Sequence, residues 1–177
     1  NDGHEEFDKS VSFSIERVSG VKILRKYRKS YMINEYLTQN LKVQCIIADH
    51  WKSLELIKTK KKKICLIHSK EINHKKGSRL NNKVLDVLNN VDNVVANSNF
   101  TKKLAIDLGV EEQRITVINP GVDPVAEIPK IDLRKAEEIL IGKKQRLITV
   151  SRFDKRKNHE KVIMTVRNLK EKFPNIK

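Results

Sequence analysis

Short apolar runs alternate along the chain with segments whose apolar residues recur at helical spacing. The runs are rich in β-branched residues, as in strands buried within a parallel sheet, and lie at residues 43–48, 64–68, 93–98, 114–118 and 147–151. Helical spacing occurs at residues 21–41, 80–91, 99–108 and 158–173. Residues 10–18 alternate in part and predict one more strand. This order predicts an α/β fold with a Rossmann-like, doubly wound parallel sheet flanked by helices.

Residues that start and stop elements support these bounds. Ser98 precedes the helix over 99–108 as an N-cap, and Gly109 follows it as a C-terminal stop. An Asn-Pro-Gly sequence ending at Gly121 predicts a tight turn after the fourth run. Residues 124–144 hold two prolines, mixed charge and one short helical pattern, so we expect a linker there.

The net charge of the chain bears on its possible binding partners more than its overall composition does. The chain has 37 lysines and arginines against 22 acidic residues, a net charge of +15. Such a field favours anionic partners: nucleic acid, phosphorylated small molecules or an anionic membrane surface. Biased composition, rich in Lys, Asn and Ile together, also explains the excess, so both interpretations stay open. The lysine run at 60–63 predicts a solvated turn, with a membrane-facing patch as the alternative.

Two further features bear on the compartment. No stretch approaches the ~18 apolar residues of a membrane span, and the acidic, polar first ten residues do not resemble a signal peptide. Cys45 and Cys65 both lie in apolar runs, which favours buried thiols over a disulfide. We therefore expect a cytoplasmic protein.

Ligands of open α/β sheets bind at the carboxyl ends of the strands, which makes three positions candidates for chemistry. His68, Ser98 and Arg152 each follow a predicted strand, and Lys157 precedes the last predicted helix. A helix N-terminus carrying two added cations attracts a dense negative charge, such as a diphosphate. A merely solvated cationic turn is the alternative at this point.

Other kinds of site are disfavoured. The spacing of His68, Glu71 and His74 does not fit a helical zinc motif, so we predict no metal site. Asp49 and Trp51 end another strand, where a packed Trp with polar neighbours is favoured over a pocket wall. Neither a P-loop nor a GxGxxG motif occurs. Aromatic residues make up 5% and are not interleaved with basic ones as on an RNA-stacking surface.

Two longer segments resemble a known family. VVANSNFTKKLAIDLGVEEQRITVINPGVDP, residues 94–124, is similar to the end of the N-terminal domain of retaining glycosyltransferases of family 4, which have the GT-B fold. LITVSRFDKRKNHEKVI, residues 147–163, is similar to the opening of that family's C-terminal domain, in which an Arg is followed five positions later by a Lys. The similarity extends from about residue 43 onward and is weak before it.

The resemblance implies a reaction. A UDP- or GDP-linked sugar would lie between two Rossmann-like domains and pass its glycosyl group, with retention, to a sugar or lipid-linked acceptor. The family generally needs no metal or other cofactor. By analogy Arg152 and Lys157 would bind the donor diphosphate, and His68 would be the catalytic-site histidine that hydrogen-bonds the transferred sugar. Ser98 and Gly121 match the motif with structural duties, a helix cap and a tight turn.

The resemblance also implies a division of the chain. Residues 1–123 would form a partial, acceptor-side N-terminal domain, 124–145 an interdomain linker, and 146–177 the start of an incomplete nucleotide-sugar-binding domain. The family's Gly-rich loop and its distal pair of glutamates are not found. We therefore expect an internal segment that has no transferase activity alone, with its last strand and helix loosely held.

Two other functions stay open. A non-catalytic, basic α/β domain would bind nucleic acid or another polyanion, with a steep dependence on salt. A sugar-phosphate or sucrose-type synthase of the same superfamily would share the fold. Under the leading hypothesis we expect no specific nucleic-acid partner, and the basic surface would contact anionic lipid at the inner face of a membrane.

Overall fold

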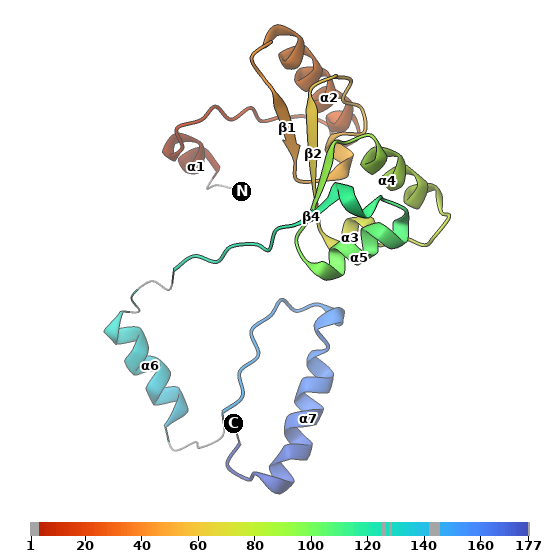
Figure 1. Ribbon diagram of the computed structural model, residues 1–177. Coiled ribbons are helices and arrows are strands. Elements are labelled where there is room, and N and C mark those ends of the chain that lie inside the picture. The colour runs from red at the N-terminus through yellow and green to blue at the C-terminus, as the bar shows by residue number, and fades with distance from the viewer. Residues whose placement is uncertain (1–3, 125–126, 128, 142–145, 177) are drawn as a thin grey trace. The chain divides into compact units, whose positions relative to one another are not determined.

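The computed structural model describes residues 4–124, 127, 129–141 and 146–176. These residues fall into two compact units (Figure 1). The first unit, Asn1–Gly121, contains the sheet, and the second unit, Val122–Lys177, contains helices α6 and α7.

A parallel sheet of four strands organises the first unit. Its strands are adjacent in chain order, and they are β1 (Cys45–Ala48), β2 (Lys62–Ile67), β3 (Asn93–Ala96) and β4 (Ile115–Val117). In the register Ala48 pairs with Cys65, Ile67 with Ala96, and Ala96 with Val117. The predicted α/β fold with a Rossmann-like parallel sheet is confirmed, but its doubly wound order is wrong for the described strands, since they follow one another across the sheet without a reversal. Because all strands run the same way, their carboxyl ends meet at one edge of the sheet.

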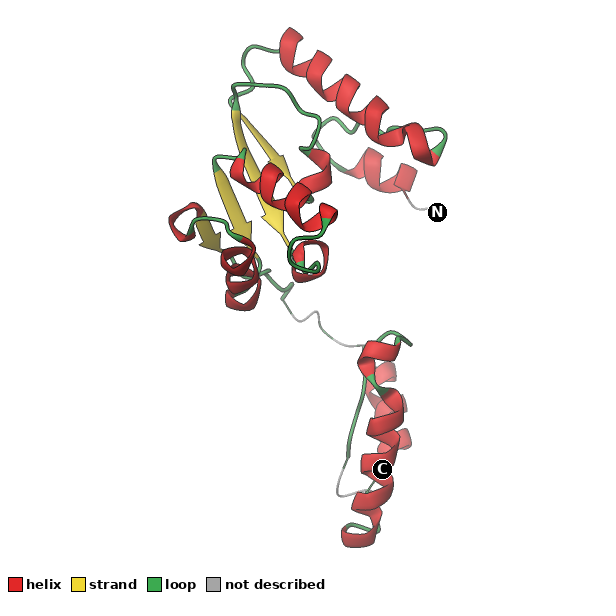
Figure 2. Cartoon of the chain, turned by 90° about the vertical axis from the view of Figure 1, so that its right-hand side faces the viewer, coloured by secondary structure: helices red, strands yellow, loops and turns green. Residues whose placement is uncertain are grey.

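Helices connect and accompany these strands (Figure 2). They are α1 (His4–Ser10), α2 (Lys22–Gln39), η1 (Trp51–Ser53), α3 (Ser69–Ile72), α4 (Arg79–Asn89), α5 (Asn99–Leu108) and η2 (Glu112–Arg114). The helices predicted over 21–41, 80–91 and 99–108 all form. At α5 the Ser98 hydroxyl accepts a hydrogen bond from the Thr101 N–H, and Gly109 ends the helix at φ 115°, in the left-handed region.

The core lies against one face of the sheet. Cys65 and Val94 point to this face and are fully buried, together with Val84 and Leu88 of α4. The side chains that alternate with the buried ones along the strands point to the opposite face. They are only half-buried or exposed: Ile47, Ile64, Leu66 and Val95. Ile47, on the edge strand β1, is 66% exposed. The sheet thus has one covered face and one open, apolar face.

The strand predicted over 10–18 is wrong. Residues 11–20 form no strand, and Phe13 is 64% exposed. The segment is instead held by an ion pair between Arg17 and Asp8, whose Nη2 and Oδ1 atoms are 2.5 Å apart. Partial alternation does not make a strand when no neighbouring strand offers backbone hydrogen bonds.

Two predicted turns also need correction. The lysine run turns only at Lys60 and Lys61, because Lys62 and Lys63 already begin β2. The Lys61 ammonium donates to the Asn40 carbonyl at 2.7 Å and so caps the end of α2. No tight turn forms at Gly121: residues 118–124 contain no turn or bend, and Pro120 favours an extended conformation at Asn119, the residue before it.

Helix α2 has two different sides. Ser30 and Leu37 are its buried residues. Leu24, Tyr27 and Tyr31, which carry the helical spacing in the sequence, are 53%, 61% and 68% exposed. These three side chains, called the α2 stripe below, lie outside the core of the first unit.

In the second unit, the described residues form α6 (Lys130–Leu140), the short η3 (Lys155–Lys157) and α7 (His159–Lys172), and no strand. The strand predicted over 147–151 is therefore wrong: Ile148 and Val150 are 88% and 87% exposed. A strand needs a partner for its backbone N–H and C=O groups, and no described segment supplies one. The helix predicted over 158–173 forms, yet it buries none of its residues, Val162 and Ile163 included.

Candidate functional site

Three polar side chains follow three neighbouring strands. Asp49 comes directly after β1, His68 after β2 and Asn97 after β3. Sequence reasoning singled out His68, placed Asp49 beside a packed Trp rather than in a pocket wall, and missed Asn97. The same signal pointed to both neighbours, since each follows a strand of a parallel sheet and such ends meet at one edge.

The three side chains form a chain of contacts centred on His68. Its Nε2 lies 2.9 Å from Oδ1 of Asp49, and its Nδ1 lies 3.4 Å from Nδ2 of Asn97. Both ring nitrogens of the histidine are therefore engaged, one by a carboxylate and the other by an amide. We call this group the strand-end triad.

The partners of the two ring nitrogens of His68 indicate which nitrogen carries the proton. A carboxylate only accepts, so Nε2 of His68 must donate to Asp49. On the other side, Oδ1 of Asn97 accepts from the Thr101 hydroxyl at 2.7 Å, which turns the amide N–H groups toward Nδ1. The network thus fits a neutral imidazole protonated at Nε2, with its lone pair at Nδ1.

The loops that carry the triad are tied together by Trp51. This side chain is 1% exposed, and its indole N–H donates to the Glu71 carbonyl at 3.0 Å. His74 donates to the same carbonyl at 2.9 Å, and the Glu71 carboxylate accepts from the His68 backbone N–H. The packed Trp favoured by the sequence therefore joins η1, which follows β1, to α3, which follows β2.

His68, Glu71 and His74 do not converge on a common point. The His68 ring contacts Asp49, the Glu71 carboxylate accepts from the His68 backbone N–H, and the His74 ring contacts the Glu71 carbonyl. The described residues contain no group of three or more His, Cys, Asp or Glu side chains that could hold a metal ion. His50, beside Asp49, accepts a hydrogen bond from the Lys52 N–H at 3.0 Å. Partial burial lowers the pKa of His50, so it too favours the neutral ring.

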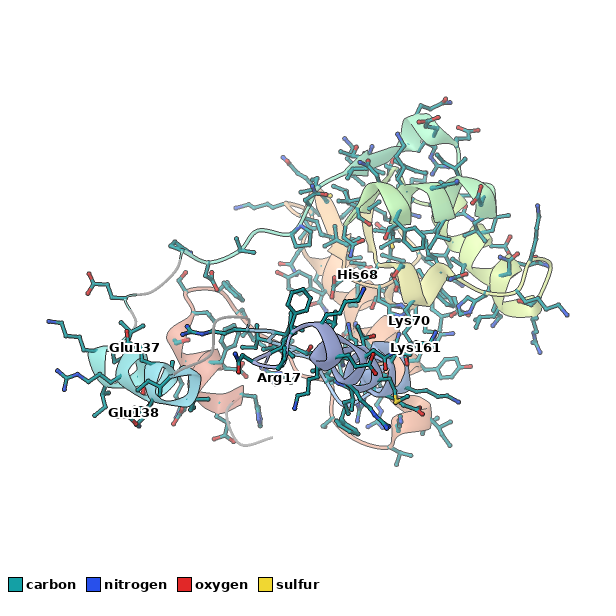
Figure 3. The ribbon with its side chains drawn as sticks, turned by 90° about the horizontal axis from the view of Figure 1, so that it is seen from below. Arg17, His68, Lys70, Glu137, Glu138 and Lys161 are labelled. Atoms are coloured by element: carbon teal, nitrogen blue, oxygen red, sulfur yellow. The ribbon has the colours of Figure 1, made fainter. Side chains whose placement is uncertain are left out.

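The triad is open to solvent on its outer side. The His68 side chain, labelled in Figure 3, is 48% exposed and that of Asp49 is 81% exposed. A hydroxyl-rich ligand could donate to the carboxylate and reach the imidazole without displacing any buried group. Ser98 next to Asn97 has the structural task of capping α5 rather than facing a ligand.

Arg152 and Lys157 belong to the second unit. Arg152 lies in an irregular exposed segment, and Lys157 is the last residue of η3, two residues before α7. Neither side chain forms an ion pair within the described residues. The predicted strand that would have aimed Arg152 is absent, whereas the predicted helix start near Lys157 is present.

Another cation of this cluster is already neutralised. Arg156 lies 2.9 Å from the Asp154 carboxylate, and this hydrogen bond to Arg156 holds the pKa of Asp154 well below its usual range. Asp154 also accepts from the Arg156 backbone N–H and caps η3. Among the described residues the motif therefore leaves three cations without an ion pair, Arg152, Lys155 and Lys157, while the pair of Asp154 and Arg156 shapes the turn.

A hollow of about 360 Å³ lies in the first unit near the start of β2. Two of its four charged lining residues, Glu55 and Lys83, are paired with each other at 3.3 Å, and Glu55 also contacts Lys26 at 2.5 Å. The triad, at the carboxyl ends of the strands, offers more unused hydrogen-bonding capacity and is the better candidate site.

A comparison with protein families finds one match. The family model "Glycosyltransferase Family 4" matches residues 4–125, which is 122 of the 177 residues and includes the strand-end triad. No curated protein matches the chain.

Proposed function

Since the chain belongs to glycosyltransferase family 4, we propose that it takes part in transferring a sugar from a UDP- or GDP-linked donor to an acceptor. The transfer retains the configuration at the anomeric carbon and needs no metal ion. The observation that carries this proposal is the family match over 4–125, the region that holds the strand-end triad. The triad supplies polar groups suited to sugar hydroxyls at the edge of the sheet where ligands bind.

His68 has the role of hydrogen-bonding the transferred sugar. Its exposed ring and the carboxylate of Asp49 lie next to each other at the strand ends. A sugar presents several hydroxyls, each able to donate and accept, so a carboxylate and a neutral imidazole suit it. These contacts would orient the sugar while the bond to the diphosphate breaks.

Arg152 and Lys157 have the role of binding the diphosphate. Both cations are unpaired within the described residues, and no side chain caps the N-terminus of α7. Its free N–H groups and its dipole add to the attraction for an anion. Charge that grows on the departing nucleotide would be stabilised by these groups, which is why no metal is needed.

Calorimetry tests this proposal. UDP and GDP are titrated without metal into the 177-residue chain, into Arg152→Ala/Lys157→Ala, and into a control, Lys161→Ala/Lys170→Ala. The control removes the same charge from exposed positions of α7. We expect one nucleotide to bind the wild type and the control, and its affinity to fall at least about tenfold in the first variant because two charge-assisted contacts are lost.

Two results would contradict the proposal. Equal losses in both double variants would mean that only the overall charge attracts the nucleotide. Absence of nucleotide binding, with tight and steeply salt-dependent binding of nucleic acid instead, would favour the polyanion-binding alternative.

We further propose that the acceptor is lipid-linked and that the protein contacts the inner, anionic face of a membrane through the α2 stripe. The stripe exposes two tyrosines and a leucine beside the cations Arg25 and Arg28, the composition of an interfacial helix. None of the helices in the described parts of the chain has the length and apolar character needed to cross a bilayer. Two free thiols, Cys45 and Cys65, are compatible with a reducing compartment.

Liposome co-sedimentation tests the membrane contact. The wild type, Tyr27→Ser/Tyr31→Ser and the control Phe100→Ser are mixed with vesicles of anionic or neutral lipid. Phe100 is 63% exposed but lies on α5, away from the stripe. We expect only the stripe variant to lose binding to anionic vesicles. Binding that is no greater to anionic than to neutral vesicles would contradict the proposed membrane contact.

A further inference from the structure

The contact between Asp49 and His68 joins two loops that are far apart in the sequence. Asp49 follows β1 and His68 follows β2, 19 residues later, yet Oδ1 and Nε2 are 2.9 Å apart. We propose that Asp49 is a positioning residue that holds His68 in one orientation and as the Nε2–H tautomer. This inference rests on the proposed function only in that His68 is taken to face the sugar.

The geometry gives the imidazole a different partner at each nitrogen. The Asp49 carboxylate accepts a hydrogen bond from the Nε2–H group, whereas the Asn97 amide N–H groups face Nδ1, with Nδ2 3.4 Å away. Turning the ring over would place Cε1 beside the carboxylate and Cδ2 beside the amide, so both contacts of the ring nitrogens would be lost and the observed orientation is favoured. Asn97 is itself held, since its Oδ1 accepts from the Thr101 hydroxyl at 2.7 Å.

The consequence for a ligand is specific. With the proton on Nε2 and directed at Asp49, the ring presents only an acceptor, the lone pair at Nδ1. The contact of Nδ1 with Asn97 is long, at 3.4 Å, so a sugar hydroxyl can compete for it. His68 would then accept a hydrogen bond from the sugar, and Asp49 would set that role without being the group that fills it.

Nuclear magnetic resonance of the ring nitrogens tests this inference directly. The 177-residue chain is labelled with ¹⁵N at histidine, and the two nitrogen shifts of His68 are read at a pH at which the imidazole is neutral. The shifts give the ratio of Nε2–H to Nδ1–H forms. The variants are Asp49→Ala, Asn97→Asp and, as a control, Asp107→Asn, an exposed carboxylate on α5.

We expect Asp49→Ala to lower the Nε2–H to Nδ1–H ratio about threefold to fivefold, because the lost contact is partly exposed to solvent. Asn97→Asp places an acceptor beside Nδ1 while keeping an oxygen for Thr101, so it should lower the ratio as well. The Asp107 control should leave the ratio unchanged. Amide spectra that match the wild type away from the triad show that each variant is folded.

An unchanged ratio in Asp49→Ala would overturn the inference, whatever the result for Asn97→Asp. A change in the control as large as that in Asp49→Ala would do the same. The measurement uses no sugar or nucleotide. Failure of nucleotide binding in the calorimetric test would therefore contradict the proposed function without altering the result for Asp49.

Discussion

Replacing Trp51 by Phe should destabilise the first unit by about 2 kcal/mol. The indole is 1% exposed and donates to the Glu71 carbonyl at 3.0 Å. Losing this hydrogen bond costs about 1 kcal/mol, and the space left by the smaller ring costs about 1 kcal/mol more. The carbonyl is not orphaned, because His74 still donates to it at 2.9 Å.

That second donor makes a sharper test possible. In Trp51→Phe/His74→Ala the Glu71 carbonyl loses both side-chain donors, so the double variant should lose about 1 kcal/mol more than the sum of the single variants. Urea unfolding followed by far-ultraviolet circular dichroism measures all four proteins. Fluorescence does not serve, since Trp51 is the one tryptophan of the chain.

The exposed Tyr31→Phe is the control and should change stability by less than about 0.5 kcal/mol. A loss in Trp51→Phe no greater than in this control would refute the reasoning that the indole is held in the core. Additive losses in the double variant would show that the two donors do not share the carbonyl.

Three further predictions concern backbone strain, charge and thiol reactivity. Gly109→Ala should cost about 1 kcal/mol in urea unfolding because φ is 115°, whereas Gly121→Ala, with an ordinary φ and open space around it, should cost nothing. A hydrogen bond to Lys26 lowers the pKa of Glu55 below 4.5, so Glu55→Gln should lose about 1 kcal/mol at pH 7. That loss should shrink as pH falls below 4.5, and a constant difference across this range would contradict the assignment. Burial raises the pKa of Cys65 to about 12, so iodoacetamide at pH 8 should leave it unmodified in the native chain, as mass spectrometry would show.

The sheet could be predicted because its strands are short, continuous apolar runs rich in β-branched residues. Local pattern sufficed for β1 to β4 and for the helix capped by Ser98. It did not suffice at residues 10–18 and 147–151, which have the residues of a strand but form none. Whether such a segment becomes a strand depends on a neighbour with free backbone groups, and a local pattern carries no information about that neighbour.

The strand-end triad, the candidate site, could be predicted only in part, again because a local pattern carries no information about distant neighbours. His68 stands out by its place after a strand, but the residues it contacts are 19 and 29 positions away. Asp49 was interpreted as a polar neighbour of a packed Trp51 in preference to a pocket wall, and Asn97 was not singled out. Their meeting at His68 depends on the parallel order of the strands. Once that order is established, all three positions follow.

The open face of the sheet links the stability of the first unit to whatever lies against it. Ile47 on this face is 66% exposed, and Ile64, Leu66 and Val95 are only half-buried. A separate molecule that covered these side chains would bind the folded state and not the unfolded one. By mass action, the melting temperature should therefore rise with the concentration of that cover. In the presence of such a molecule, the melting temperature of the first unit would depend on that molecule's concentration as well as on the amino-acid sequence.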